Sequence, residues 1–173
     1  MMRISRTAVV MVSLLAVGVM AGCGNSNAGK PAAEGAAYRL SAEPENAKGV
    51  KEVRDVAKTD EEVTVVGRIG GDTSPWVDGQ AAFLVVDPSL KPCNEKGEEE
   101  ACATPWDYCC DTDLLLTHKA MVKIVDKSGK TVAMDARKLL GVKESQTVVV
   151  RGQAKRDEAG NLTVLAAGVF VKP

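Results

Sequence analysis

The alternation of apolar and polar positions predicts a β-rich domain in the second two-thirds of the chain. Runs rich in β-branched residues, or alternating with polar ones, are typical of strands that bury one face. We expect five strands, at 62–69, 80–86, 120–125, 146–156 and 162–171. Valines at near-helical spacing predict a short helix within residues 46–58. Asp135 and Gly141 have the residue types that start and end helices, and they predict a second short helix between them.

The predicted order is helix, two strands, an insertion at 88–113, a strand, a short helix and two strands. Five strands with a helix between the third and the fourth resemble the OB-fold, a small five-stranded Greek-key barrel. We therefore expect a mainly β, OB-like barrel over residues 46–173 with one or two short helices and a cysteine-rich insertion. A β-sandwich of similar strand count is the competing fold.

The first 23 residues have the pattern of an export signal. Arg3 and Arg6 precede an apolar stretch, and small residues lead into Cys23. This ending resembles the lipobox of bacterial lipoproteins, which implies that residues 1–22 are removed and that Cys23 carries lipid. An ordinary signal peptide that is cut nearby is the alternative. We expect an extracytoplasmic protein anchored to a membrane, at the periplasmic face of the outer membrane.

Residues 23–45 are rich in Gly, Ala, Asn, Ser and Pro and offer little to bury. That composition predicts a flexible tether. We accordingly expect the domain to fold from about Ala47 without this segment.

Composition weighs against several functions. The net charge of −1 and the aromatic content of 3% do not favour nucleic-acid binding, which uses basic surfaces and stacked rings. The chain has one histidine and lacks the common hydrolase, metalloprotease and P-loop motifs. We expect no enzymatic activity and no cofactor.

The insertion holds the distinctive chemistry, four clustered cysteines: Cys93, Cys102, Cys109 and Cys110. In an exported protein such a set predicts disulfides, pairing 93–109 with 102–110 or 93–110 with 102–109. The alternative is a thiolate site for zinc or copper, to which His118, Asp107 and Asp111 could contribute. A labile redox disulfide is a third possibility.

Aromatic residues near the insertion are candidates for a binding surface. Trp106 and Tyr108 flank Asp107 within the insertion, and Trp76 lies in the loop that borders the usual OB-fold ligand groove. Packing against the insertion is the alternative role for these rings. We expect His118 to lie at a strand edge rather than to act as a ligand.

The motif Thr-Pro-Trp-Asp-Tyr-Cys-Cys at 104–110 resembles the signature of an uncharacterised family of predicted bacterial lipoproteins, as do residues 87–93 and 155–163. The resemblance implies an exported OB-like domain and no known activity.

The sequence predicts a membrane-tethered, extracytoplasmic OB-fold binding module of the bacterial envelope. Its partner would be a protein, a peptide or a glycan. A metal or redox protein that uses the four cysteines is the first alternative, and an oligonucleotide-binding OB-fold is the second.

Overall fold

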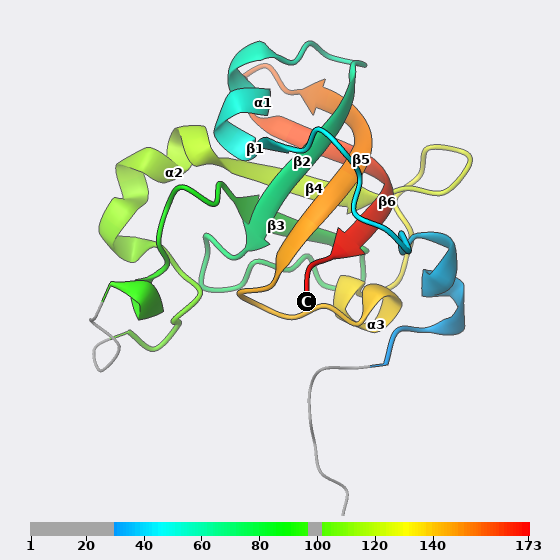
Figure 1. The fold of residues 1–173 in the computed structure, drawn as a ribbon, viewed down its shortest axis with the longest axis horizontal. Helices are drawn as coiled ribbons and strands as arrows, with labels where there is room; N and C mark the ends of the chain where they lie inside the picture. Colours follow the sequence, from blue (N-terminus) through cyan, green and yellow to red (C-terminus); the bar gives the residue numbers. More distant parts are fainter. Residues whose placement is uncertain (1–29, 97–101) are drawn as a thin grey trace, which may run out of the picture.

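The computed structural model describes residues 30–96 and 102–173, and in it the predicted strands form a closed barrel (Figure 1). The barrel strands are β2 (Glu62–Ile69), β3 (Ala82–Val86), β4 (Lys119–Ile124), β5 (Thr147–Arg156) and β6 (Leu162–Val171). They follow the order β2-β3-β4-β6-β5, and pairing of β2 with β5 closes the ring. A two-residue strand, β1 (Lys48–Gly49), adds to β2 in parallel.

The pairing pattern is that of an OB-like barrel, as the sequence predicted. β4 and β6 are parallel, and the other pairings between barrel strands are antiparallel. The expected bounds of the first and last barrel strands, 62–69 and 162–171, match β2 and β6. Val148, Val150 and Ala154 on β5 face the core, as predicted, while Arg151 and Gln153 are exposed.

The short helix between β4 and β5 is α3 (Ala136–Leu140), and both of its predicted ends are confirmed. The Asp135 carboxylate accepts a hydrogen bond from the Arg137 amide at 2.9 Å. Gly141 ends the helix in the left-handed conformation, with φ of 67°. Leu139 and Leu140 are buried and belong to the core of the barrel.

Helix α1 (Val50–Val56) lies within the predicted range 46–58 and buries Val50 and Val53. Its first turn is held by Asp87, which follows β3. The Asp87 carboxylate accepts hydrogen bonds from the amides of Lys51 at 2.8 Å and Ser89 at 2.9 Å. A Cβ on Gly49 would lie 2.5 Å from that carboxylate, so only glycine permits this approach. Asp87 therefore ties the helix to the end of β3.

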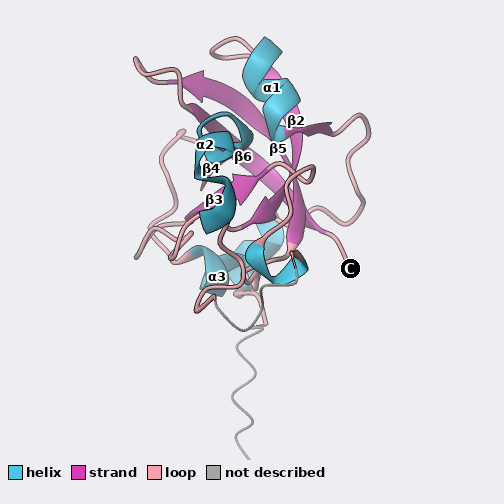
Figure 2. Cartoon of the chain, turned by 90° about the vertical axis from the view of Figure 1, so that its left-hand side faces the viewer, coloured by secondary structure: helices cyan, strands magenta, loops and turns pink. Residues whose placement is uncertain are grey.

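A third helix, α2 (Thr112–His118), was not predicted. It lies on the same side of the barrel as α1 (Figure 2). It carries three consecutive leucines, and such a run has no helical periodicity in the sequence. In the helix only Leu115 is buried, at 8% exposed, while Leu114 and Leu116 are 45% and 73% exposed. The insertion predicted at 88–113 therefore ends in a helix rather than leading directly into β4.

The described part of the predicted tether, residues 30–45, packs on the barrel. Ala33–Ala37 form a 3-10 helix, η1, beside α3 (Figure 1). The Ala32 amide donates to the Lys138 carbonyl at 3.0 Å, and the backbone of Tyr38 and Leu40 pairs with Val169. The expectation of a flexible tether is wrong here, because backbone pairing replaces the apolar burial that the composition lacks. The ordered domain begins well before residue 46.

We predict that this segment contributes to stability. A chain that starts at residue 46 should melt about 4–8 °C below one that starts at residue 30, because it loses at least four hydrogen bonds worth roughly 2 kcal/mol or more together. Calorimetry of the two chains tests this. Equal melting temperatures would restore the interpretation of residues 30–45 as a tether.

We also predict a pH-dependent role for Asp87. Burial works to raise its pKa, but the hydrogen bonds from Lys51 and Ser89 outweigh burial and hold the pKa below its ordinary value of 3.8. A lowered pKa means that the ionised form stabilises the fold above that ordinary value and that this stabilisation fades as the pH falls below it. Asp87→Asn should lower the free energy of unfolding by about 1–2 kcal/mol at pH 7.

Urea unfolding at pH 7 and at pH 3 measures the difference between the variant and the wild type. The difference should shrink at pH 3. The control is Asp78→Asn, because the Asp78 side chain is 98% exposed and its loss should change stability by less than about 0.5 kcal/mol. A difference that is the same at both pH values would show that folding does not lower the pKa of Asp87.

Candidate functional site

The insertion is held together by pairing between its two arms. The Cys93 amide donates to the Asp107 carbonyl at 3.0 Å, and the Asn94 amide donates to the Pro105 carbonyl at 3.3 Å. Lys96 forms an ion pair with Asp111 across the same arms. Two 3-10 turns, η2 (Cys93–Glu95) and η3 (Cys109–Asp111), result from this arrangement. The pairing brings cysteines distant in sequence to one place.

A close backbone contact fixes the insertion to the barrel just beyond β2. The Gly71 amide donates to the Trp106 carbonyl at 3.3 Å. A Cβ on Gly70 would lie 2.4 Å from that carbonyl oxygen, and Gly71 has a φ of 85°. Both positions require glycine. Arg68, on β2, adds an ion pair to Glu95 at 2.5 Å.

Tyr108 anchors the insertion through a small second core. It is 1% exposed and packs with Val86, Leu115 and Leu90. Its hydroxyl has no hydrogen-bond partner among the described residues. Burial raises the pKa of Tyr108 to about 12. This ring therefore acts in packing, which was the alternative role in the sequence analysis.

The other two rings of the predicted surface differ in how far they are buried. Trp76 is 8% exposed and packs at a tilt against Phe83, with ring centroids 5.9 Å apart. Its indole nitrogen donates to Glu144 at 2.5 Å. Trp106 is half-buried and donates to the Thr73 carbonyl at 3.2 Å. The Asp107 carboxylate accepts from the Tyr108 amide at 2.7 Å. The expected surface of Trp76, Trp106, Asp107 and Tyr108 is thus largely used to fix loops to the barrel.

The cysteines converge, but the predicted disulfides are not present in the described residues. The sulfur atoms of Cys93 and Cys109 are 3.3 Å apart, against about 2.05 Å in a disulfide. Those of Cys109 and Cys110 are 4.0 Å apart. The three sulfurs all lie within 4.8 Å of one another. Cys93 is buried, whereas Cys109 and Cys110 are exposed.

Cys102 lies beside these three sulfurs. Hydrogen bonding to the Thr104 backbone, with further bonding to Cys93 and Cys109, lowers the pKa of its thiol. Bonding to Cys93 and then to Cys110 raises the pKa of Cys109 to about 12. The pKa values of Cys102 and Cys109 therefore depend on the neighbouring sulfurs.

Histidine does not join this group. His118 ends α2, and its Nδ1 atom lies 2.9 Å from the Leu114 carbonyl of the same helix. Among the described residues, the set whose ligand atoms lie within 4.8 Å of one another consists of Cys93, Cys109 and Cys110 alone. His118 does not lie at a strand edge as expected, because it is the last residue of α2 and directly precedes β4.

A groove of about 420 Å³ crosses the outer face of β3, β4 and β6. Leu84, Met121 and Thr163 form its floor, each paired with the next across neighbouring strands. Leu115 and Leu116 of α2 form one wall, and Asp157 and Asn161 of the β5–β6 loop lie at one end. Sequence reasoning did not single out this groove, although the half-exposed face of the third predicted strand was its signal.

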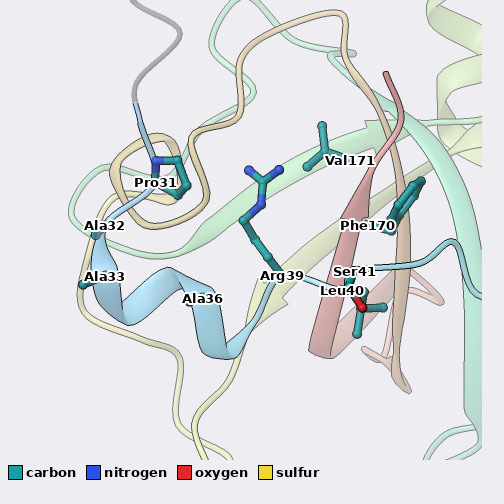
Figure 3. Close-up of a pocket in the computed structure, with 9 residues that line it drawn as sticks. All are labelled: Pro31, Ala32, Ala33, Ala36, Arg39, Leu40, Ser41, Phe170 and Val171. Atoms are coloured by element: carbon teal, nitrogen blue, oxygen red, sulfur yellow. The ribbon is translucent and has the colours of Figure 1, made fainter.

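A second hollow, of about 580 Å³, lies between η1 and the end of β6 (Figure 3). Arg39 crosses it and donates from its guanidinium to the Leu140 carbonyl at 2.5 Å. Its walls come from the N-terminal segment that packs on the barrel. We regard it as a consequence of that packing.

Comparison with known proteins found similarity among solved structures. No protein-family model matches the chain, and no curated protein matches it. One solved structure that is similar to it is described as "OBody AM1L10 bound to hen egg-white lysozyme". The TM-score is 0.42 at 12% identity, over 78% of this chain and 98% of that chain. Within the described residues, no helix has the length and apolar character needed to cross a bilayer.

Proposed function

We propose that the protein is a membrane-tethered, extracytoplasmic binding module that holds an extended peptide segment of an envelope protein in the groove over β3, β4 and β6. The observation that carries this proposal is the position of the groove. OB-fold domains commonly bind ligands on the face of their second and third strands, next to the loop between the fourth and fifth. In this barrel those elements are β3, β4 and the β5–β6 loop.

The lining of the groove favours a peptide. Its floor and one wall are mainly apolar, through Leu84, Met121 and Leu116, and methionine adapts to varied partners. Thr163 is the polar member of the floor. Arg54, Lys119 and Lys123 also line it, so acidic side chains on the ligand would be complementary. The half-exposed floor residues lie side by side on three neighbouring strands, so an extended peptide segment would cross these strands.

A glycan and an oligonucleotide fit the groove less well. Single-stranded nucleic acids stack their bases on aromatic rings, and no aromatic residue lines this groove. Ring stacking is equally a common means of holding the flat faces of sugars. The formal net charge of −1 adds nothing that would attract a phosphate backbone.

The membrane location is part of the same proposal. Cys23, the expected lipid attachment site, and the signal at 1–22 lie outside the described residues. Ala32 is the first described residue whose backbone is bonded to the rest of the domain, and the chain from Cys23 to Ala32 spans at most about 30 Å. A partner would therefore be a protein of the same membrane surface or one that reaches it.

We predict that substitutions in the groove weaken peptide binding. Peptides selected from a displayed random library on the full chain should be enriched in apolar and acidic residues. Met121→Asp should weaken their binding by at least about tenfold, which is about 1.4 kcal/mol, because it places a charge on the apolar floor. Lys123→Glu should weaken it about three- to tenfold, and more so at low salt.

The matched control is Lys127→Glu, the same charge change at an exposed position that does not line the groove. Titration calorimetry gives the affinities, and thermal melting confirms that each variant is folded. The proposal fails if Lys127→Glu weakens binding as much as Lys123→Glu does. It also fails if the selected peptides bind the Met121→Asp variant as tightly as they bind the wild type.

A further inference from the structure

The thiol cluster lies in the insertion and requires an explanation separate from the groove. Three sulfur atoms, from Cys93, Cys109 and Cys110, lie within 4.8 Å of one another. We propose that these three residues form a binding site for a thiophilic metal ion with a filled d shell, zinc(II) or copper(I). This site does not depend on the peptide-binding groove, and its test is separate.

The spacing of the sulfurs suits a metal ion bound between them. Zinc–sulfur bonds are about 2.3 Å long, which places tetrahedral sulfur ligands about 3.8 Å apart. The two distances along the cluster, 3.3 Å for Cys93–Cys109 and 4.0 Å for Cys109–Cys110, lie on either side of that value. A metal ion would require only small side-chain rotations.

Adjacent cysteines are awkward ligands in an extended chain, because neighbouring side chains point to opposite faces. Here Cys109 and Cys110 lie in the 3-10 turn η3, which brings their sulfurs to the same side. Cys93 reaches them from the other arm of the insertion, where its amide is bonded to the Asp107 carbonyl. The backbone therefore places three sulfurs together without a covalent link.

The donor set selects for soft ions. The residues that converge are all cysteines, and thiolates favour zinc and copper(I) over calcium or magnesium. Each thiol that binds releases its proton to solvent as the sulfur–metal bond forms. Exposed Cys109 and Cys110 give the ion a path of entry, and buried Cys93 forms the inner end of the site.

Two neighbouring groups complete the surroundings. The Lys96 ammonium, paired with Asp111, lies close enough to Cys93 and Cys110 to interact with their charge, so it would offset part of a thiolate cluster's negative charge. The sulfur of Cys102 lies 3.2 Å from the Thr104 carbonyl, and Cys102 is outside the group of sulfurs that lie within 4.8 Å of one another. Three sulfurs satisfy copper(I), whereas tetrahedral zinc needs a fourth ligand, for which Cys102 would have to turn from Thr104.

The test uses the full chain with Cys23→Ser, which leaves the four cysteines of the insertion as the only thiols. The reduced protein is titrated without oxygen with zinc(II) and, separately, with copper(I), in competition with a chelator of known affinity. We expect one ion per chain. Cys93→Ser or Cys110→Ser should weaken binding by about a hundredfold or more, since each removes a direct ligand, and even outer-shell losses reach that size.

Asp113→Asn is the matched control, because it removes an exposed acidic group three residues after Cys110 that is outside the cluster, and its binding should be unchanged. Cys102→Ser distinguishes the two ions. If Cys102→Ser loses zinc binding but keeps copper(I) binding, zinc uses four sulfurs and copper(I) uses three. If the variant keeps the binding of both ions, the three converging sulfurs suffice. Circular dichroism confirms that each variant keeps the barrel, and Cys110→Ser, at an exposed position, carries little risk of unfolding.

The proposal is overturned if the reduced wild-type cluster binds neither ion stoichiometrically, or if Asp113→Asn weakens binding as much as Cys93→Ser does. It is also overturned if protein isolated from its own membrane holds all four insertion cysteines in disulfides. Neither result bears on the groove, because peptide binding is measured in a different assay on different residues.

Discussion

The contact between the Trp106 carbonyl and the backbone of Gly70 and Gly71 determines how the insertion sits on the barrel. Without a Cβ at Gly70, the insertion approaches the end of β2 closely enough for the Gly71 amide to bond to that carbonyl. Tyr108 is then buried against Val86 and Leu115. A side chain at Gly70 would push the insertion outward, because the Trp106 carbonyl oxygen lies 2.4 Å from the position that its Cβ would take, whereas a Cβ at Gly71 would meet Val86 of the barrel at 2.4 Å.

Both proposed sites depend on this placement. The insertion holds the converging cysteines in its two arms and continues directly into α2, whose Leu115 and Leu116 wall the groove. The barrel supplies the floor of the groove and, at Gly71 beyond β2, the backbone amide to which the insertion is bonded. An OB-like barrel thus gains two distinct surfaces from one insertion between its second and third strands.

Most of the barrel could be predicted from the sequence, because each strand buries one face and its pattern is local. The ends of α3 were equally local, since Asp135 and Gly141 act through neighbouring backbone groups. The failures depend on distant partners. The N-terminal segment is ordered by backbone bonds to β6 and α3, Trp76 is buried by Phe83 and Glu144, and α2 is positioned by Tyr108. Composition and periodicity describe neighbouring residues, so they do not predict contacts between residues that are distant in sequence.

The most direct test of this account is hydrogen exchange in a Gly70→Ala variant, with Lys127→Ala as the control, because Lys127 is an exposed turn residue outside the insertion. The account predicts faster amide exchange in residues 88–96 and 102–118 of the Gly70→Ala variant, while β2, β5 and β6 stay protected. The control should leave the insertion unchanged. Unaltered exchange in the insertion of Gly70→Ala, or equal loss of protection throughout the barrel, would contradict it.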